Sequence, residues 1–179
     1  MASQIPEFYL REVLSVEDLS EKFLESLVAN LSDSQHMRFS RHSSKKHDRQ
    51  TSRVFIGELI FQGGRYFQIL NISSLDFLGT LTLRPHSTLE CEAGILIFKS
   101  AAGQGLGTAV WMGLPKMVKM AGYNRLLAGC HRDNLAMRTL MKNLGMSQIS
   151  PKNWQSGNNL LEVNMYFSLD LSGVPMDEI

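Results

Sequence analysis

The sequence predicts a mixed α/β fold of the α+β kind, in which helices interrupt a mostly antiparallel sheet. Two observations predict this class: segments with a helical apolar period alternate with short β-branched or aromatic segments, and three short segments follow one another directly. In chain order we expect β α α β β β α β α (β) β. The 179 residues contain no repeat, low-complexity tract or proline-rich linker. We therefore expect one domain over residues 1–179, with its core at about residues 7–170.

The first third of the chain predicts one strand and two helices. EFYLREVLSV (residues 7–16) has a strand pattern, and Ser15 to Asp18 supply helix-start chemistry for VEDLSEKFLESLVANL (residues 16–31). The apolar face of this helix is formed by Leu19, Phe23, Leu24, Leu27 and Val28. A basic, polar segment then leads into a second helix, SRVFIGELIF (residues 52–61), which stops at Gly63-Gly64.

A run of three strands fills the middle of the chain. RYFQILNIS, FLGTLTLRP and ECEAGILIF (residues 65–73, 77–85 and 90–98) are rich in aromatic and β-branched residues and are separated by turn residues. Such a succession is typical of an antiparallel meander. Beyond a glycine-rich stretch, one face of a further helix is formed by Leu106, Val110, Leu114, Met117, Val118 and Ala121.

The end of the chain predicts a strand, a helix and a final strand. RLLAGC (residues 125–130) has a strand pattern, and Asp133 or Asn134 caps the helix that follows. Gly145 ends this helix as a C-terminal cap. Its inward face is formed by Met137, Leu140, Met141 and Leu144. The tail NLLEVNMYFSLDL (residues 159–171) alternates well enough for a last strand.

The composition argues against strongly charged or lipid partners. There are 18 Lys and Arg against 17 Asp and Glu, so no overall field favours nucleic acid or a membrane surface. No apolar run approaches the ~18 residues of a membrane span, and the N-terminal MASQIPEFYLRE lacks the pattern of a signal peptide. Cys91 and Cys130 lie in apolar stretches and are expected to be buried, reduced thiols. We expect a cytoplasmic protein with no membrane or direct nucleic-acid partner, and a homodimer is compatible with the sequence.

A glycine-rich stretch stands at the start of the central helix. In KSAAGQGLGTAVWMGL (residues 99–114), Gly103, Gly105 and Gly107 alternate, although glycine costs a helix about 1 kcal/mol relative to alanine. The free N–H groups and the dipole of a helix N-terminus favour phosphate, and glycine lets the backbone touch the anion. A tight turn that binds nothing is the alternative. The Walker pattern lacks its Lys here, and G-x-G-x-G differs from the dinucleotide fingerprint G-x-G-x-x-G, so neither pattern fits.

Two blocks in the correct order resemble the GNAT superfamily of N-acetyltransferases over nearly the whole chain. AAGQGLGT resembles the acetyl-CoA loop [RQ]-x-x-G-x-[GA], with Gly105 and Gly107 at the glycine positions and Ala102 in place of the usual Arg or Gln. HRDNLAMRTLMKNLGM resembles N-x-x-A-x-x-L-Y-x-K-x-G-F, with Asn134 at the Asn and Gly145 at the Gly. Together with MRFSRHS, these segments look like the branch of ribosomal-protein α-amine and amino-sugar acetyltransferases.

The resemblance implies how acetyl-CoA is bound. It implies a mixed sheet of about seven strands, splayed between the fourth and fifth, with about four helices. Pantetheine would enter this gap and bond to the backbone of the fourth strand, while the diphosphate lies on the glycine turn. The implied cofactor-binding residues are Ile95, Leu96, Ile97, Gly103, Gln104, Gly105, Leu106, Gly107, Thr108 and Asn134. A plain helix cap is the alternative for Asn134, and no metal is implied.

Carboxylates and histidines are the candidates for the base that deprotonates the acceptor amine. Glu92 is the first choice and Glu90 the second, because both stand at the start of the fourth strand, where family members carry a catalytic Glu. His131 is another candidate, with His86 behind it. A solvated carboxylate and a structural histidine are the alternatives. The family's Tyr, which protonates the departing thiolate, is replaced by Met141, so water or another group would act, or the thiolate would leave as such.

The acceptor is expected between the first two helices and the later strands. The segment of residues 38–53 contains six basic side chains, Arg38, Arg41, Lys45, Lys46, Arg49 and Arg53. Arg38, Ser40 and His42 are the candidates for substrate binding. The patch would hold an anionic acceptor such as a nucleotide-linked amino sugar, or rest against a ribosome, and a solvated helix face is the alternative.

We therefore expect acetyl transfer from acetyl-CoA to a small amine such as an amino sugar, by direct attack in a ternary complex. A protein N-terminal acetyltransferase of the ribosomal-protein type is one alternative. A non-catalytic module that binds coenzyme A is the other, suggested by Ala102 and Met141.

Overall fold

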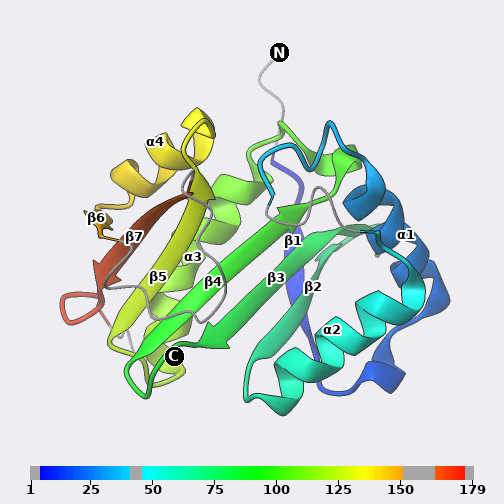
Figure 1. Cartoon of the computed structure of the whole chain (residues 1–179), viewed down its shortest axis with the longest axis horizontal. Helices are drawn as coiled ribbons and strands as arrows, with labels where there is room; N and C mark the ends of the chain where they lie inside the picture. The colour runs from blue at the N-terminus through cyan, green and yellow to red at the C-terminus, as the bar shows by residue number, and fades with distance from the viewer. Residues whose placement is uncertain (1–4, 41–45, 151–163, 176–179) are drawn as a thin grey trace. The chain divides into compact units, whose positions relative to one another are not determined.

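The computed structural model describes residues 5–40, 46–150 and 164–175 (Figure 1). Its elements in chain order are β1 (Phe8–Val13), η1 (Val16–Asp18), α1 (Glu21–Ser32), α2 (Arg49–Phe61), β2 (Arg65–Asn71), β3 (Phe77–Pro85), β4 (Glu90–Ile97), η2 (Lys99–Ala101), α3 (Leu106–Met120), β5 (Arg125–His131), α4 (Leu135–Asn143), β6 (Ser147–Ile149) and β7 (Asn164–Asp170). The chain forms two compact units, Met1–Arg84 with Ile95–Gly107, and Pro85–Gly94 with Thr108–Ile179. The three boundaries between the units fall before the last residue of β3, inside β4 and inside α3.

The strands are hydrogen-bonded in the order β1-β2-β3-β4-β5-β7-β6. In the first unit, β1 pairs with β2 and β2 with β3, both antiparallel. In the second unit, β7 pairs antiparallel with β5 and with β6, and the first residues of β4 pair in parallel with β5. The predicted mixed, mostly antiparallel sheet and its helices are therefore confirmed.

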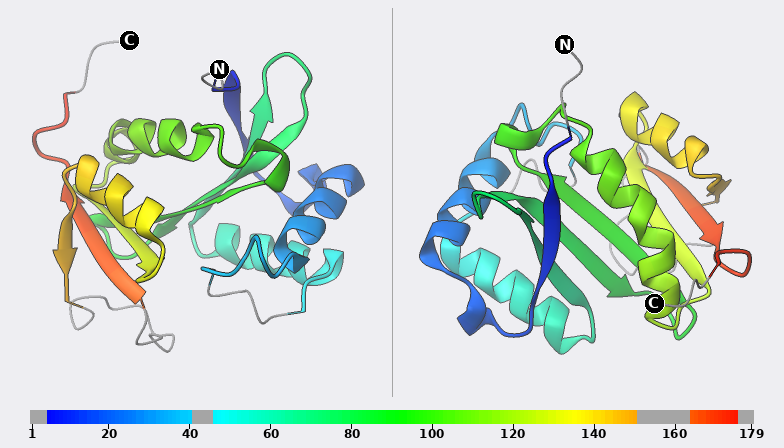
Figure 2. Two further views of the ribbon diagram at one scale, coloured as in Figure 1. Left: turned by 90° about the horizontal axis from the view of Figure 1, so that it is seen from above. Right: turned by 180° about the vertical axis from the view of Figure 1, so that it is seen from behind.

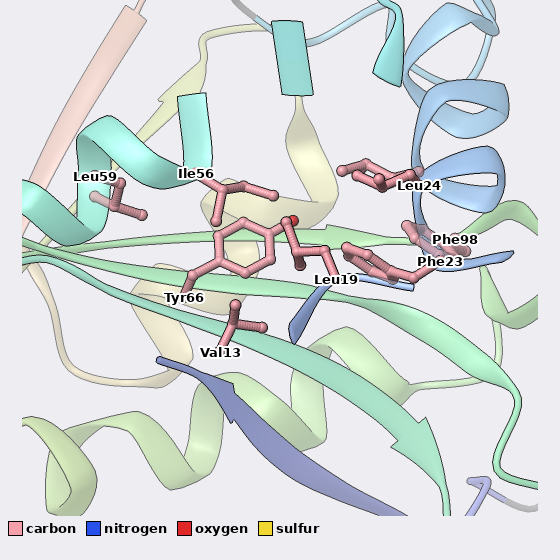
Figure 3. Packing of buried hydrophobic residues seen from close by; sticks show 9 residues of the cluster. Val13, Leu19, Phe23, Leu24, Ile56, Leu59, Tyr66 and Phe98 are labelled. Atoms are coloured by element: carbon pink, nitrogen blue, oxygen red, sulfur yellow. The ribbon is translucent and has the colours of Figure 1, made fainter. Parts of the chain in front are cut away.

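The core of the first unit lies between its strands and the two helices that precede β2. Figure 2 shows α1 and α2 side by side on one face of β2. Phe23 of α1 makes edge-to-face contacts with Tyr66 and Phe77, with ring centroids 6.3 Å and 5.1 Å apart. Leu24 and Ile56 are also fully enclosed in this cluster (Figure 3). The predicted apolar face of the first helix is therefore in the core, except that Val28 is only half-buried.

The predicted start of the first helix was wrong. Instead of one helix from residue 16, the chain forms the short η1, capped by Ser15, and then turns to extended backbone at Leu19. A second cap follows, because the hydroxyl of Ser20 accepts from the Phe23 N–H at 3.2 Å and begins α1 at Glu21. Two serines five residues apart each satisfy free helix N–H groups, so the chain can restart its helix and still bury Leu19.

The second helix starts earlier than the apolar pattern predicts. It begins at Arg49 rather than at residue 52, because the carboxylate of Asp48 accepts from the Thr51 N–H at 2.7 Å. The Thr51 hydroxyl in turn accepts from the Asp48 N–H, which completes a capping box. The polar first turn carries no apolar residue, so periodicity alone could not reveal it.

The second unit is built around β5. Its seven residues pair with β7 from Arg125↔Asp170 to His131↔Asn164, one residue beyond the predicted end of the strand. The predicted residues 159–163 of the last strand lie outside the described residues. Gly145 follows α4 with φ 74°, which confirms the predicted C-terminal cap. Leu127 and Tyr166 form a small buried cluster beside Ile149.

Both cysteines, Cys91 and Cys130, are free and buried, as the sequence predicts. No helix within residues 5–40, 46–150 and 164–175 is both long and apolar enough to cross a membrane. Within the same residues, no group of three or more His, Cys, Asp or Glu side chains is arranged to hold a metal ion.

Candidate active site

The glycine turn, defined as residues 102–107, links η2 to the start of α3. Gly103 and Gly105 have φ angles of 77° and 82°, in the left-handed region where side chains other than glycine are strained. Gly107 does not, because it is already the second residue of α3. A Cβ added there would lie 3.4 Å from Cγ1 of Ile97, an ordinary contact. Two of the three glycines are therefore required by the backbone path, and the third is not.

The side chains of the turn leave its backbone to face a ligand. Gly103 and Gly105 are exposed, whereas Leu106 is 1% exposed and so has its side chain in the core. Gln104 folds back, donating from Nε2 to the Ser100 carbonyl at 2.9 Å. The first N–H groups of α3 have no acceptor within the helix. Thr108, the third residue of α3, is exposed and brings a hydroxyl to the same helix end.

The end of β4 carries the backbone predicted to bind pantetheine. Ile95, Leu96 and Ile97 are half-buried. The carbonyl oxygen of Leu96 lies against Gly79 of β3, where a Cβ would come within 2.3 Å of it. The carbonyl oxygen of Ile97 accepts from Nε2 of His36 at 2.8 Å. His36 is a residue that sequence reasoning missed, because 61 positions separate it from Ile97 and no motif joins them.

The two candidate carboxylates of β4 have different surroundings in the second unit. Glu92 is 7% exposed and pairs in register with Leu127 of β5. Glu90 accepts from Arg125 at 2.7 Å, in an ion pair whose Glu90 side chain is 26% exposed. An enclosed carboxylate suits a base better than one already neutralised by a guanidinium. Glu92 is therefore the more enclosed of the two carboxylates, and Glu90 is the one held in an ion pair with Arg125.

The parallel ladder of β4 and β5 is short. It joins Glu90–Glu92 to Arg125–Leu127, whereas the rest of β5 as far as His131 keeps β7 as its antiparallel partner. At the end of β5, the Asp133 N–H donates to Nδ1 of His131 at 3.2 Å. The Asp133 carboxylate is 3.7 Å from the same nitrogen, too far for a hydrogen bond. Because the lone pair of Nδ1 is already engaged, His131 is poorly placed to act as a base through that atom.

His86 lies in the turn between β3 and β4, where its backbone N–H donates to the Glu90 carbonyl at 2.8 Å. Asn134 caps α4, because its side-chain oxygen accepts from the Met137 N–H at 3.1 Å. The helix-cap alternative is thus what the structure describes for Asn134. Its amide nitrogen is the end that could still donate to a ligand. Met141, at the position of the family's Tyr, is fully buried and has no proton to donate.

The substrate-binding candidates of the basic segment lie in and beyond the turn after α1. Arg38 is exposed, donates to the Gln35 carbonyl at 2.9 Å and stacks 4.8 Å from the Phe39 ring centroid. Ser40 is half-buried, with its backbone N–H donating to the Met37 carbonyl at 2.7 Å. His42 lies outside the described residues, as do Arg41 and Lys45.

Two arginines of the basic segment, residues 38–53, already form ion pairs within the protein. Arg49 donates to Glu21 and Glu25 of α1, at 3.0 Å and 3.3 Å. Arg53 donates to Glu21 at 2.6 Å and to the Val16 carbonyl at 3.0 Å. These hydrogen bonds lower the pKa of Glu21. Two of the six basic side chains therefore join α2 to α1 through ion pairs that are largely exposed to solvent.

Comparison with protein families gives the class of the molecule. The model of the acetyltransferase (GNAT) domain matches residues 9–147. The chain therefore belongs to the GNAT acetyltransferase family and is an acyltransferase. A comparison with curated proteins finds no match.

Solved structures share the fold at low identity. A GNAT-family acetyltransferase from Bacillus anthracis has a TM-score of 0.69 and 17% identity, over 96% of this chain and 99% of that one. Spermidine N-acetyltransferase from Vibrio cholerae, in complex with CoA and spermine, has a TM-score of 0.70 and 12% identity, over 92% and 96%. The ribosomal L7/L12 α-N-protein acetyltransferase RimL, in complex with coenzyme A, has a TM-score of 0.66 and 12% identity, over 91% and 93%.

Proposed function

We propose that the protein is an N-acetyltransferase that moves the acetyl group of acetyl-CoA to a primary amine in a ternary complex. One observation carries the proposal. In a chain of the GNAT family, two exposed glycines with left-handed φ angles, Gly103 and Gly105, lead directly into the N-terminus of α3. Such a helix end is suited to a diphosphate, because its N–H groups and its dipole both favour negative charge.

The remaining parts of acetyl-CoA have candidate partners in each unit. In the first unit, backbone groups of Ile95–Ile97 would bind the amides of pantetheine, apart from the Ile97 carbonyl, which His36 occupies. In the second unit, the side-chain amide nitrogen of Asn134 is the proposed donor to coenzyme A. Thr108 would add its hydroxyl to the diphosphate site. These assignments use groups that are exposed or half-buried.

Glu92 is the proposed base. It would take a proton from the acceptor ammonium, and the neutral amine would then attack the thioester carbonyl carbon. As the carbon–nitrogen bond forms, a β4 N–H would stabilise the developing oxyanion. The carbon–sulfur bond then breaks, the nitrogen releases its second proton to water so that a neutral amide is formed, and the electron pair leaves with sulfur. Met141 cannot protonate it, and a thiol pKa of ~8.5 allows the sulfur to leave as a thiolate near neutral pH.

The acceptor is proposed to be a small amine such as an amino sugar. Among the proteins of similar fold, one acts on spermidine and another on a protein α-amine, so a polyamine and a protein N-terminus are the competing acceptors. The ion pairs of Arg49 and Arg53 weaken the case for a strongly anionic acceptor. A module that binds coenzyme A without turnover remains the alternative from another class.

A thiol-release screen tests the proposal. Acetyl-CoA is offered with amino sugars, polyamines, aminoglycosides, peptides and purified ribosomal proteins, and free thiol is measured. Turnover with a small amine supports the proposal, whereas turnover only with peptides or ribosomal proteins favours the protein acetyltransferase. Binding of coenzyme A with no turnover for any acceptor would favour the non-catalytic module. We place the activity in the cytoplasm, in keeping with the two free, buried cysteines.

A further inference from the structure

The last residue of β4 is held by a side chain from the turn that follows α1. The Ile97 carbonyl receives a hydrogen bond at 2.8 Å from Nε2 of His36, which lies in the turn just after α1. A carbonyl oxygen can only accept, so this nitrogen carries the proton. His36 is half-buried, and nothing in the proposed function assigns it a role.

This bond lies on the side of β4 that faces away from β3. The residues on either side of Ile97 are turned toward β3, since the Leu96 carbonyl lies against Gly79 and the Phe98 N–H donates to the Leu78 carbonyl at 2.8 Å. Successive peptide groups of a strand point in opposite directions. The Ile97 carbonyl therefore points to the edge of β4 on which the proposed pantetheine contacts would be made.

Two further contacts from α1 hold the residues that follow. The side-chain oxygen of Asn30 accepts from the Lys99 N–H at 2.7 Å, and the Asn30 amide is itself oriented by donating to the Ser26 carbonyl at 2.8 Å. The Asp33 carboxylate accepts from Nζ of Lys99 at 2.8 Å and from the His36 N–H at 2.9 Å. Residues 97–99 are thus held at three points, by Asn30, Asp33 and His36.

We propose that His36 is a positioning residue for the binding of coenzyme A. The inference rests on the proposed function. By fixing the Ile97 carbonyl, His36 orders the backbone between the pantetheine strand and the glycine turn before the ligand arrives. A segment that is already ordered loses less conformational freedom on binding, and this raises affinity. Asn30 and Asp33 support His36 by anchoring the next residues of the same segment.

The test is calorimetric titration of the full chain with coenzyme A, together with the thermal unfolding midpoint. His36→Ala removes the donor, and His36→Met removes it while filling the volume. His36→Gln keeps an amide N–H that can reach the Ile97 carbonyl. Lys22→Gln, on α1, is the control, because it removes an exposed ion pair with Asp76 at 3.9 Å.

We expect His36→Ala and His36→Met to weaken coenzyme A binding by about three- to tenfold, as the loss of one hydrogen bond implies. His36→Gln should restore most of the affinity, and Lys22→Gln should leave it unchanged. If His36→Ala fails to fold, the comparison of His36→Met with His36→Gln decides the matter. Equal affinity in wild type and His36→Met, or no recovery in His36→Gln, overturns the inference while the proposed function stands. Absence of binding to the wild type overturns the proposed function, and the inference with it.

Discussion

The glycine turn in the first unit and the acidic start of β4 in the second unit prepare for chemistry in different ways. The turn relies on backbone conformation: Gly103 and Gly105 take left-handed φ angles, and Leu106 buries its side chain. The start of β4 relies on side-chain environment, because Glu92 is enclosed and Glu90 is paired with Arg125. A backbone conformation that requires glycine can be recognised in the sequence from the spacing of its glycines. A carboxylate set apart by burial leaves no such pattern, because burial depends on residues elsewhere in the chain.

The largest effect is expected from a substitution at the acidic start of β4. Glu92→Gln should lower the turnover rate by roughly 100-fold or more, because it removes general-base catalysis while keeping the shape of the side chain. Coenzyme A affinity should not change. The rate is measured by thiol release once an acceptor has been found, and the affinity by calorimetry.

Glu90→Gln is the matched control for that substitution. It removes the ion pair with Arg125, whose side chain is 51% exposed, and should reduce the free energy of unfolding by less than about 1 kcal/mol. A loss of rate in Glu90→Gln that equals the loss in Glu92→Gln contradicts the assignment of the base.

A second substitution probes the position of β4 from the side of β3. Gly79→Ala places a methyl group 2.3 Å from the Leu96 carbonyl oxygen, so backbone must move. We expect a loss of about 1–3 kcal/mol in the free energy of unfolding, with weaker coenzyme A binding because Leu96 and Ile97 shift. Denaturant unfolding and calorimetry measure the two effects. Gly113→Ala is the control, because a methyl group there meets nothing within 4 Å; an equal loss in both variants contradicts the account of β4.

The glycine turn offers a smaller but internally matched test. Gly105→Ala forces a side chain into a φ of 82° and should cost about 1–2 kcal/mol, as well as weakening coenzyme A binding. Gly107→Ala lies at an ordinary helical φ and should leave stability unchanged or raise it by up to about 1 kcal/mol. Thermal unfolding separates the two variants. Similar losses in both would mean that helix geometry, and not left-handed backbone, explains the glycines.

The smallest expected effect concerns acid pH. The Lys99 ammonium, aided by the His36 N–H, lowers the pKa of Asp33 from 3.8 to about 2. Its stabilising contribution is therefore fully present above pH 3.8 and is lost as the pH falls through about 2, where the folded carboxylate also takes up a proton. In Asp33→Asn, the thermal unfolding midpoint should therefore fall less steeply than in wild type as the pH is lowered from about 5 to about 2. Thermal scans at each pH measure the difference. Parallel curves for the two proteins contradict this role for Asp33.

Local patterns predicted most of the fold. The bounds of β3 match the pattern at residues 77–85, and α3 and α4 lie where period and capping residues indicate. The start of α1 was missed because Ser15 and Ser20 are both good caps, and periodicity cannot choose between them. Helix propensity is similar for either choice, and only the tertiary position of Leu19 decides it.

The candidate site could be predicted from the sequence only where residues close together in the chain form it. The glycine turn is local, and its spacing alone indicated glycines that take left-handed φ angles before a helix. The bond from His36 to Ile97 spans 61 positions, and the pairing of Arg49 and Arg53 with Glu21 joins two helices. Counting charges within one segment overlooks acids supplied by another. Contacts of this kind are set by packing of α1, which no short motif encodes.

The most direct measurement is a calorimetric titration of wild type and Gly105→Ala with coenzyme A and with pantetheine, which lacks the diphosphate together with the phosphorylated adenosine. If the N–H groups of the glycine turn bind the diphosphate, wild type binds coenzyme A more tightly than pantetheine, and Gly105→Ala loses affinity for coenzyme A alone. No heat with coenzyme A, or an equal loss for both ligands, would contradict the account.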